Sequence, residues 1–306
     1  MKAVRIQSYG DEPAVQDIAM PEPGEGEVLM QVQAAALNPL DVQLQAGYLA
    51  DWFPLAFPFT LGTDFAGVVK RIGNRVTAFR EGDAIIARPD PVRGGGFAEY
   101  ASVPASACVP LPTPLTPDEG ACIPTAGGTA WFALLESAKL KTGETVLIHA
   151  GAGGVGTFGV QFAKAAGARV LATASGDGVA FARELGADRV IDYRSEDFAA
   201  LGEPVDVVLD LIGGDTQARS FGLLRPGGRL VSTVSPPDAE KAKAKGVSAS
   251  MFALDLSGDR LAQLVNAVVN NGVRVVIDCK VPLAGFPDAW ARQRSGHTRA
   301  KTVLLL

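Results

Sequence analysis

Three glycines, Gly151, Gly153 and Gly156, have the spacing G-x-G-x-x-G, which is suited to binding phosphate groups. The first glycine permits a tight turn, the second lets backbone approach a pyrophosphate, and the third lets a helix pack closely on a strand. We therefore take residues 151–156 as candidate cofactor-binding residues; besides the three glycines, they are Ala152, Gly154 and Val155. The spacing alone is weak evidence in a chain with 35 glycines, since an ordinary strand-to-helix turn can also have it.

The elements on either side of this glycine loop indicate whether it binds a nucleotide or is an ordinary turn. Residues 145–148 form a short apolar run that is typical of a buried parallel strand. After the loop, apolar residues recur at helical spacing as far as Ala166, and Gly167 is placed to end the helix. A strand that ends and a helix that begins at the loop predict a nucleotide-binding site, with the helix N-terminus facing the phosphates.

The same alternation of strand and helix continues along the chain. We expect strands at residues 169–173, 189–193, 205–210 and 229–234, helices at 179–185, 216–224 and 261–269, and a turn at 225–228. Such alternation is typical of an α/β fold in which a doubly wound parallel sheet is covered by helices on both faces. We assign this domain to residues 118–272.

The first hundred residues have a different pattern. Short apolar runs at 27–33, 67–72 and 83–87 are separated by Gly, Pro and Asn, which indicates an antiparallel, barrel-like β domain. The proline-rich stretch 104–117 is expected to connect the domains. Residues 301–306 are expected to form a strand that returns to the first domain, which then comprises residues 1–117 and 273–306.

Composition excludes several classes of protein. Hydrophobic residues make up 47% of the chain and no apolar run approaches a membrane span, so we expect a soluble enzyme without a membrane partner. The net charge of −5 opposes binding to nucleic acid. The cysteines, Cys108, Cys122 and Cys279, and the histidines, His149 and His297, show no metal-ligand spacing. The N-terminus lacks the features of a signal peptide, which predicts a cytoplasmic location.

Motifs along nearly the whole chain resemble the zinc-independent quinone oxidoreductases, a branch of the medium-chain dehydrogenase/reductase superfamily. The matching segments are residues 37–41, 61–67, 82–83, 95–100, 124–131, 151–156 and 185–193. The resemblance implies a GroES-like catalytic domain at residues 1–117 and 273–306 and a Rossmann domain at 118–272. It also implies a homodimer and hydride transfer from a reduced nicotinamide to a small-molecule quinone or α,β-unsaturated carbonyl.

The resemblance also bears on metal binding. Zinc-dependent relatives have a catalytic Cys where Asn38 stands, a His-Glu pair where Thr63 and Asp64 stand, and a four-Cys lobe further on; none of these is present here. A catalytic zinc needs about three N, S or O ligands, and Asp64 alone does not supply them. We therefore expect no zinc. A conjugated acceptor suits such an enzyme, because hydrogen bonds can hold the oxygen onto which charge delocalises.

Four residues are candidates for catalysis. The resemblance places Asn38 and Asp41 beside the nicotinamide, with Asn38 as a donor facing the substrate and Asp41 as a local cap; an Asx turn and helix cap explains the pair equally well. Thr129 resembles a threonine near the nicotinamide in relatives, or else packs between the domains. Gln43 replaces an aromatic residue of the family, so Tyr48 is a candidate phenolic donor, with simple packing as its alternative.

The end of the second strand of the parallel sheet favours NADPH over NADH. It carries no carboxylate that would accept the ribose 2′-hydroxyl and repel a 2′-phosphate. Ser175 and Tyr193 are candidate donors to that phosphate, and Arg194 or Arg299 is a candidate for its positive partner, because the lysine of related reductases falls at Gly178. Further cofactor candidates follow the later strands: Ile212, Thr233 and Phe252.

Two other functions stay open at this point. An alcohol dehydrogenase acting on saturated substrates is disfavoured by the missing zinc ligands. A nucleotide-binding protein without turnover remains compatible with the unusual Gln43. For the implied dimer, residues 247–251 are either a short edge strand that could pair with a second subunit or a loop.

Overall fold

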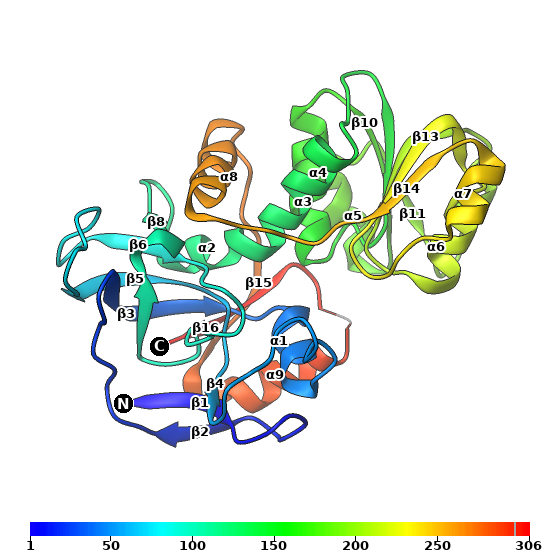
Figure 1. Cartoon of the computed structure of the whole chain (residues 1–306). Helices are drawn as coiled ribbons and strands as arrows, with labels where there is room; N and C mark the ends of the chain where they lie inside the picture. Colours follow the sequence, from blue (N-terminus) through cyan, green and yellow to red (C-terminus); the bar gives the residue numbers. More distant parts are fainter. Residues whose placement is uncertain (297) are drawn as a thin grey trace. The chain divides into compact units, whose positions relative to one another are not determined.

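The computed structural model describes residues 1–296 and 298–306, so His297, considered above as a metal ligand, lies outside the described residues. The chain divides into two compact units (Figure 1). The first unit comprises Met1–Thr125, Leu256–Val265 and Val275–Leu306, and the second comprises Ala126–Asp255 and Asn266–Arg274. The first unit thus runs past residue 117, the limit expected from the sequence, because the helix α2 (Pro117–Cys122) packs on the strands β3 (Glu27–Ala36) and β5 (Asp64–Ile72).

The second unit is built on a parallel sheet with the strand order β11-β10-β9-β12-β13-β14. Its strands are β9 (Thr145–Ile148), β10 (Arg169–Ala174), β11 (Arg189–Asp192), β12 (Val205–Asp210), β13 (Leu224–Ser232) and β14 (Ser248–Met251). Its helices are α3 (Gly128–Phe132), η3 (Ala133–Ser137), α4 (Gly154–Ala165), α5 (Asp177–Glu184), η4 (Phe198–Ala200), α6 (Gly214–Ser220) and α7 (Ala239–Lys245). Helices cover both faces of this sheet (Figure 1), which confirms the doubly wound fold. The central strands β9 and β12 are buried along their whole length, as their apolar sequences predict.

Two predictions are wrong: the turn at 225–228 and the end of the preceding helix at residue 224. The helix α6 ends at Ser220, and the strand β13 already begins at Leu224. Leu224 pairs with Val205, whereas Val207 pairs with Arg229, so the four residues between them bulge out of the ladder. The glycines that indicated a turn therefore serve an interruption within a strand.

The first unit contains two sheets. The larger has the order β15-β16-β3-β5-β6-β8, with β7 also paired to β3, and the smaller has the order β2-β1-β4. The strands not yet given are β1 (Lys2–Ile6), β2 (Ala14–Asp17), β4 (Phe59–Thr60), β6 (Ala84–Ala87), β7 (Tyr100–Pro104), β8 (Cys108–Pro110), β15 (Ile277–Pro282) and β16 (Lys301–Leu305). The remaining helices of the chain are α1 (Pro39–Ala46), η1 (Ala105–Ala107), η2 (Ile123–Gly127), α8 (Gly258–Asn270), η5 (Leu283–Gly285) and α9 (Phe286–Arg294). Of these, η2 and α8 have residues in both units. The strand β16 pairs with β3, so the chain end returns to this unit as expected.

The proline-rich stretch 104–117 is not a linker, contrary to expectation. The strand β8 within it pairs with β6, and Thr116 caps the helix α2. The Thr116 hydroxyl accepts from the Glu119 N–H at 3.3 Å, and the Glu119 carboxylate accepts from the Thr116 N–H at 2.8 Å. Prolines are compatible with this arrangement because they occupy the first turn of the helix and the end of a short strand. In the part of the chain that the structure describes, no helix is both long and apolar enough to cross a membrane.

Candidate cofactor and catalytic sites

The glycine loop joins β9 to α4 through a sharp turn at Ala150. Ala150 has a φ of 51°, in the left-handed region that few non-glycine residues adopt. Its carbonyl accepts from the Gly153 N–H at 2.9 Å, and the Gly151 N–H donates to the Thr173 carbonyl at 2.8 Å. The first N–H groups of any α-helix lack a partner within the helix, and in α4 they begin directly after this turn. The loop therefore presents donors to an anion.

Two of the three glycines of the loop have no room for a side chain. A Cβ atom on Gly156 would lie 2.1 Å from the Ala150 carbonyl oxygen, and one on Gly151 would lie 2.7 Å from the Ala172 Cβ. At Gly153 the nearest atom is again the Ala150 oxygen, at 3.2 Å. Glycine is therefore required at the first and third positions to close the turn and to bring α4 against the loop.

The residues at the ends of β10 and β11 form a small hydroxyl pair. Ser175 follows β10 and Tyr193 follows the neighbouring parallel strand β11, and their side-chain oxygens are 2.8 Å apart. Tyr193 is half exposed. A Cβ on Gly178 would lie 3.0 Å from the Ala152 Cβ, so a lysine at this position would crowd the glycine loop. The nearest positive charge in the sequence is Arg194, whose backbone N–H bonds to Asp192.

The remaining cofactor candidates of the second unit lie at the carboxyl edge of the same sheet. Ile212, half exposed, follows β12 and its N–H donates to the Asp210 carboxylate at 3.0 Å. Thr233 follows β13, and Phe252 follows β14 with its N–H bonded to the Ser232 carbonyl at 2.7 Å. This is the edge at which doubly wound sheets bind ligands. Arg299 belongs to the first unit, where its guanidinium pairs with Asp278 at 2.6 Å.

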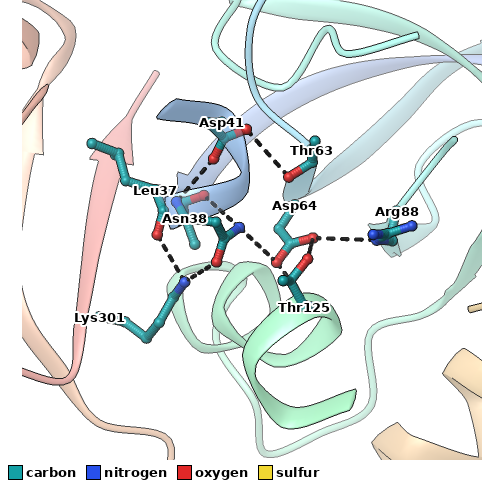
Figure 2. Close-up of polar contacts among 9 residues, drawn as sticks. Leu37, Asn38, Asp41, Thr63, Asp64, Arg88, Thr125 and Lys301 are labelled. Carbon is teal, nitrogen blue, oxygen red and sulfur yellow. Dashed lines mark hydrogen bonds and ion pairs between the residues drawn. The ribbon is translucent and has the colours of Figure 1, made fainter. Parts of the chain in front are cut away.

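A second candidate site is a buried polar network in the first unit (Figure 2). At its centre the Asp64 carboxylate, fully buried, accepts from the Asn38 side-chain amide at 3.0 Å. It also accepts from the Thr125 backbone N–H at 2.9 Å and from the Thr125 hydroxyl at 2.7 Å. These three residues come from the start of α1, the start of β5 and the helical turn after α2. Asn38, Asp64 and Thr125 thus form one hydrogen-bonded group, in which Asn38 and Asp64 are buried and Thr125 is partly exposed.

Two buried cations balance this network. The Lys301 ammonium, 3% exposed, donates to the Leu37 carbonyl at 2.8 Å and to the Asn38 side-chain oxygen. Arg88 lies 3.9 Å from Asp64, and among the described residues its Nε has no hydrogen-bond partner (Figure 2). Arg88 is thus paired with a buried carboxylate, whereas Lys301 is held by two neutral oxygens.

Asp41 is the second buried carboxylate of the network. It caps α1 by accepting from the Asn38 N–H at 2.8 Å, and it accepts from the Thr63 hydroxyl at 3.2 Å. Burial raises the pKa of Asp41 to about 7, and the neighbouring Asp64 carboxylate adds to this rise. The hydrogen bond from Asn38 and the charge of Lys301 act in the opposite direction. Asp41 therefore titrates near neutral pH.

Of the four residues predicted to be catalytic, the structure joins Asn38 and Asp41 by a hydrogen bond. Asn38 is 1% exposed, and both polar ends of its side chain are used within the network. Tyr48 follows α1 and is 77% exposed, whereas Thr129 is buried on α3 in the second unit. Among the described residues, no group of three His, Cys, Asp or Glu side chains is arranged to hold a metal ion.

Sequence reasoning missed Arg88 and Thr125 as members of the network. Arg88 directly follows the apolar strand β6, and a charge next to a buried strand is the one signal that pointed to it. Thr125 lies in a segment that resembles the family, but nothing in its spacing connects it with Asp64, 61 residues away.

Comparisons with known proteins identify the family of the chain. Residues 24–113 match a family model described as alcohol dehydrogenase GroES-like domain, and residues 185–304 match one described as zinc-binding dehydrogenase. A chloroplast envelope quinone oxidoreductase homolog of Arabidopsis thaliana is 33% identical over 322 residues, covering 99% of this chain and 98% of the relative.

Solved structures that resemble the chain over its full length include two quinone oxidoreductases. The quinone oxidoreductase from Coxiella burnetii has a TM-score of 0.91 and 34% identity, covering 100% of this chain and 99% of its own. The Escherichia coli quinone oxidoreductase complexed with NADPH has a TM-score of 0.90 and 25% identity, with both chains fully covered.

Proposed function

Because this chain belongs to the quinone oxidoreductase branch of the medium-chain dehydrogenase/reductase superfamily, we propose that it reduces a quinone or an α,β-unsaturated carbonyl with NADPH and without a metal. As a member of that branch, it is an NAD(P)H-dependent oxidoreductase. The observation that carries the choice of cofactor is the glycine loop combined with the hydroxyl pair Ser175 and Tyr193.

In this proposal the second unit binds the cofactor. The N–H groups of the glycine loop hold the pyrophosphate, and the Ser175 and Tyr193 hydroxyls donate to the 2′-phosphate. Arg194 supplies the positive charge, since Arg299 is already paired with Asp278. Bound NADPH would supply a hydride from its nicotinamide ring.

The first unit supports a reaction without a metal. At the positions of the zinc ligands of relatives stand an amide and a hydroxyl, Asn38 and Thr63, followed by the carboxylate of Asp64. All three make hydrogen bonds within the buried network: Asn38 donates to Asp64, Thr63 donates to Asp41, and Asp64 also accepts from Thr125. Such a set does not offer the converging ligands that zinc needs. We therefore propose a conjugated acceptor, whose charge hydrogen bonds can stabilise.

We assign the donor to the substrate oxygen to Tyr48 and not to Asn38. The amide nitrogen of Asn38 already donates to Asp64 and to the Ala36 carbonyl, whereas the phenol of Tyr48 is exposed. Asn38, Asp41 and Lys301 then act by fixing the start of α1, the helix that leads to Tyr48.

Replacing Tyr48 with phenylalanine is expected to lower kcat for a quinone or enone by about 100-fold, as expected for loss of one donor to a developing oxyanion. The dissociation constant for NADPH should not change. Tyr100→Phe, on β7, is the matched control and should keep the original kcat. An unchanged kcat in Tyr48→Phe would rule out this role, and stopped-flow measurement of NADPH oxidation reads it directly.

Replacing Ser175 with aspartate is expected to reverse the cofactor preference. A carboxylate at this place repels the 2′-phosphate and accepts from the ribose hydroxyls of NADH. We expect kcat/KM for NADPH to fall by about 100-fold and that for NADH to stay level or rise. Ala180→Asp adds the same charge on the exposed side of α5 and should leave the preference unchanged. A variant that still prefers NADPH would contradict the assignment of Ser175.

Subunit pairing and location complete the proposal. The strand β14 pairs with β13 on one side, and within the described residues its other edge has no strand partner. An exposed edge of this kind is suited to pairing with a second copy of the chain, so we propose a homodimer. The cytoplasmic location also stays a prediction, because the Arabidopsis relative is named for the chloroplast envelope.

A further inference from the structure

The side chain directly before the glycine loop, His149, has no role in the proposed function so far. It is 1% exposed, and both of its ring nitrogens contact buried hydroxyls. Nδ1 lies 3.2 Å from the Thr173 hydroxyl, and Nε2 lies 2.8 Å from the Ser220 hydroxyl. All three residues belong to the second unit, which holds the glycine loop.

One arrangement of protons satisfies every group in this cluster. The Ser220 hydroxyl donates to the Thr216 carbonyl at 2.7 Å, so its oxygen must accept from the N–H at Nε2 of His149. Nδ1 is then without a proton and accepts from the Thr173 hydroxyl. The oxygen of that hydroxyl in turn accepts from the Ala150 N–H at 3.1 Å. We call this series, from Ala150 to Thr216, the His149 chain.

Burial keeps the ring of His149 neutral. The low polarity of its surroundings lowers the pKa of His149 to about 4, although the charge of Asp210 acts the other way. The Asp210 carboxylate is itself occupied by the N–H groups of Ile212 and Gly213 and by the side chains of Gln217 and Ser232. A neutral ring is needed here, because a protonated Nδ1 would have no acceptor for its hydrogen while the Thr173 hydroxyl donates to it.

The His149 chain ends on the residue that shapes the loop. Ala150 holds the left-handed conformation of the turn, its carbonyl accepts from Gly153, and that same oxygen limits the approach of Gly156. Thr173 accepts two hydrogen bonds from this turn. Its hydroxyl oxygen accepts from the Ala150 N–H, and its carbonyl accepts from the Gly151 N–H. The direction of the Thr173 hydroxyl therefore decides whether its oxygen is free to accept from the Ala150 N–H.

We propose that His149 is a positioning residue for the cofactor: its neutral ring orients the Thr173 hydroxyl so that the Thr173 oxygen holds Ala150, and thereby the glycine loop, in the shape that binds pyrophosphate. This inference rests on the proposed function, because it concerns the same nucleotide site. The proposal requires that the hydrogen bond between His149 and Thr173 affects the affinity for NADPH. It also requires that the hydrogen bond between His149 and Ser220 does not affect that affinity.

Thr173→Val and Ser220→Ala test this difference. Each removes one buried hydroxyl bonded to His149, and Val has the shape of Thr. We expect Thr173→Val to raise the dissociation constant for NADPH by about 10-fold. This corresponds to the loss of one hydrogen bond that holds the loop in its binding conformation. Ser220→Ala should change it by less than about 3-fold. The dissociation constants come from fluorescence titration, and urea unfolding of each variant shows whether the fold is kept.

Two replacements of His149 provide a rescue test. Asparagine places its amide oxygen near the position of Nδ1 and can still orient Thr173, whereas glutamine places its amide nitrogen near Nε2 and serves only Ser220. We expect His149→Asn to stay within about 3-fold of the original affinity and His149→Gln to weaken it by about 10-fold. Nitrogen NMR of the original protein should show the neutral ring protonated at Nε2.

Three results would overturn the inference while leaving the proposed function intact. They are equal affinities of Thr173→Val and Ser220→Ala, full affinity of His149→Gln, and a ring protonated at Nδ1, each in a protein that binds NADPH. Failure of the original protein to bind either NADPH or NADH would instead overturn the proposed function, and the inference with it.

Discussion

Replacing Gly156 with alanine is expected to raise the dissociation constant for NADPH by at least about 100-fold and to lower the free energy of unfolding by about 1–3 kcal/mol. The added Cβ would lie 2.1 Å from the Ala150 carbonyl oxygen and 2.8 Å from the Gly151 Cα. Both atoms are backbone, so the loop itself must move and the phosphate-binding turn opens. Fluorescence titration with NADPH and urea unfolding measure the two effects.

Gly159 provides a matched control on the same helix. A Cβ there would meet the side chains of Ile148 and Leu209 at 3.5 Å, which is ordinary contact. Gly159→Ala should therefore keep its affinity for NADPH, and the higher helix propensity of alanine should offset any cost in packing. Equal affinities in Gly156→Ala and Gly159→Ala would contradict the assignment of residues 151–156 to the pyrophosphate.

Replacing Lys301 with methionine is expected to lower the free energy of unfolding by about 3–5 kcal/mol, because it removes one cation from a buried network that contains two carboxylates. The amide oxygen of Asn38 and the carbonyl of Leu37 both lose their donor. Lys2→Met is the matched control: its ion pair with Asp17 is mostly exposed, and the expected loss is below about 1 kcal/mol. Urea unfolding measures both.

The effect of Lys301→Met should grow with pH. The pKa of Asp41 is raised to about 7 in the folded protein, so its proton stabilises the fold at low pH, and this contribution is lost as the pH rises through that value. Lys301 lowers the pKa of Asp41, so ionisation of Asp41 costs more without it. The loss of stability should therefore be larger at about pH 8 than at about pH 5. The same loss at both pH values would show that Lys301 does not act on Asp41.

The parallel sheet and its glycine loop could be predicted from the sequence because their signals are local. A buried strand is a continuous apolar run, and the glycines after β9 mark the place where the chain turns into α4. Errors arose where long-range pairing decides the structure. The sequence predicts a linker where β8 lies, because only its pairing with β6 makes this segment a strand.

The candidate site was predictable to a smaller extent. The resemblance to the family pointed to Asn38 and Asp41, and their spacing also indicated the helix cap that Asp41 forms. The contact of Asn38 with Lys301, 263 residues away, and the proximity of Arg88 to Asp64 depend on the folded sheet and have no local signature. The same holds for His149, whose partners lie 24 and 71 residues along the chain.

The most direct test of metal-free reduction compares kcat/KM for NADPH oxidation with cyclohexenone and with cyclohexanone, on protein treated with a chelator. The two substrates differ only in conjugation, so the comparison isolates the need for a Lewis acid. Metal-free reduction of conjugated acceptors predicts that the enone is preferred by at least about 100-fold and that chelation has no effect. Equal reduction of the saturated ketone, or activity that disappears on chelation and returns with added zinc, would contradict it.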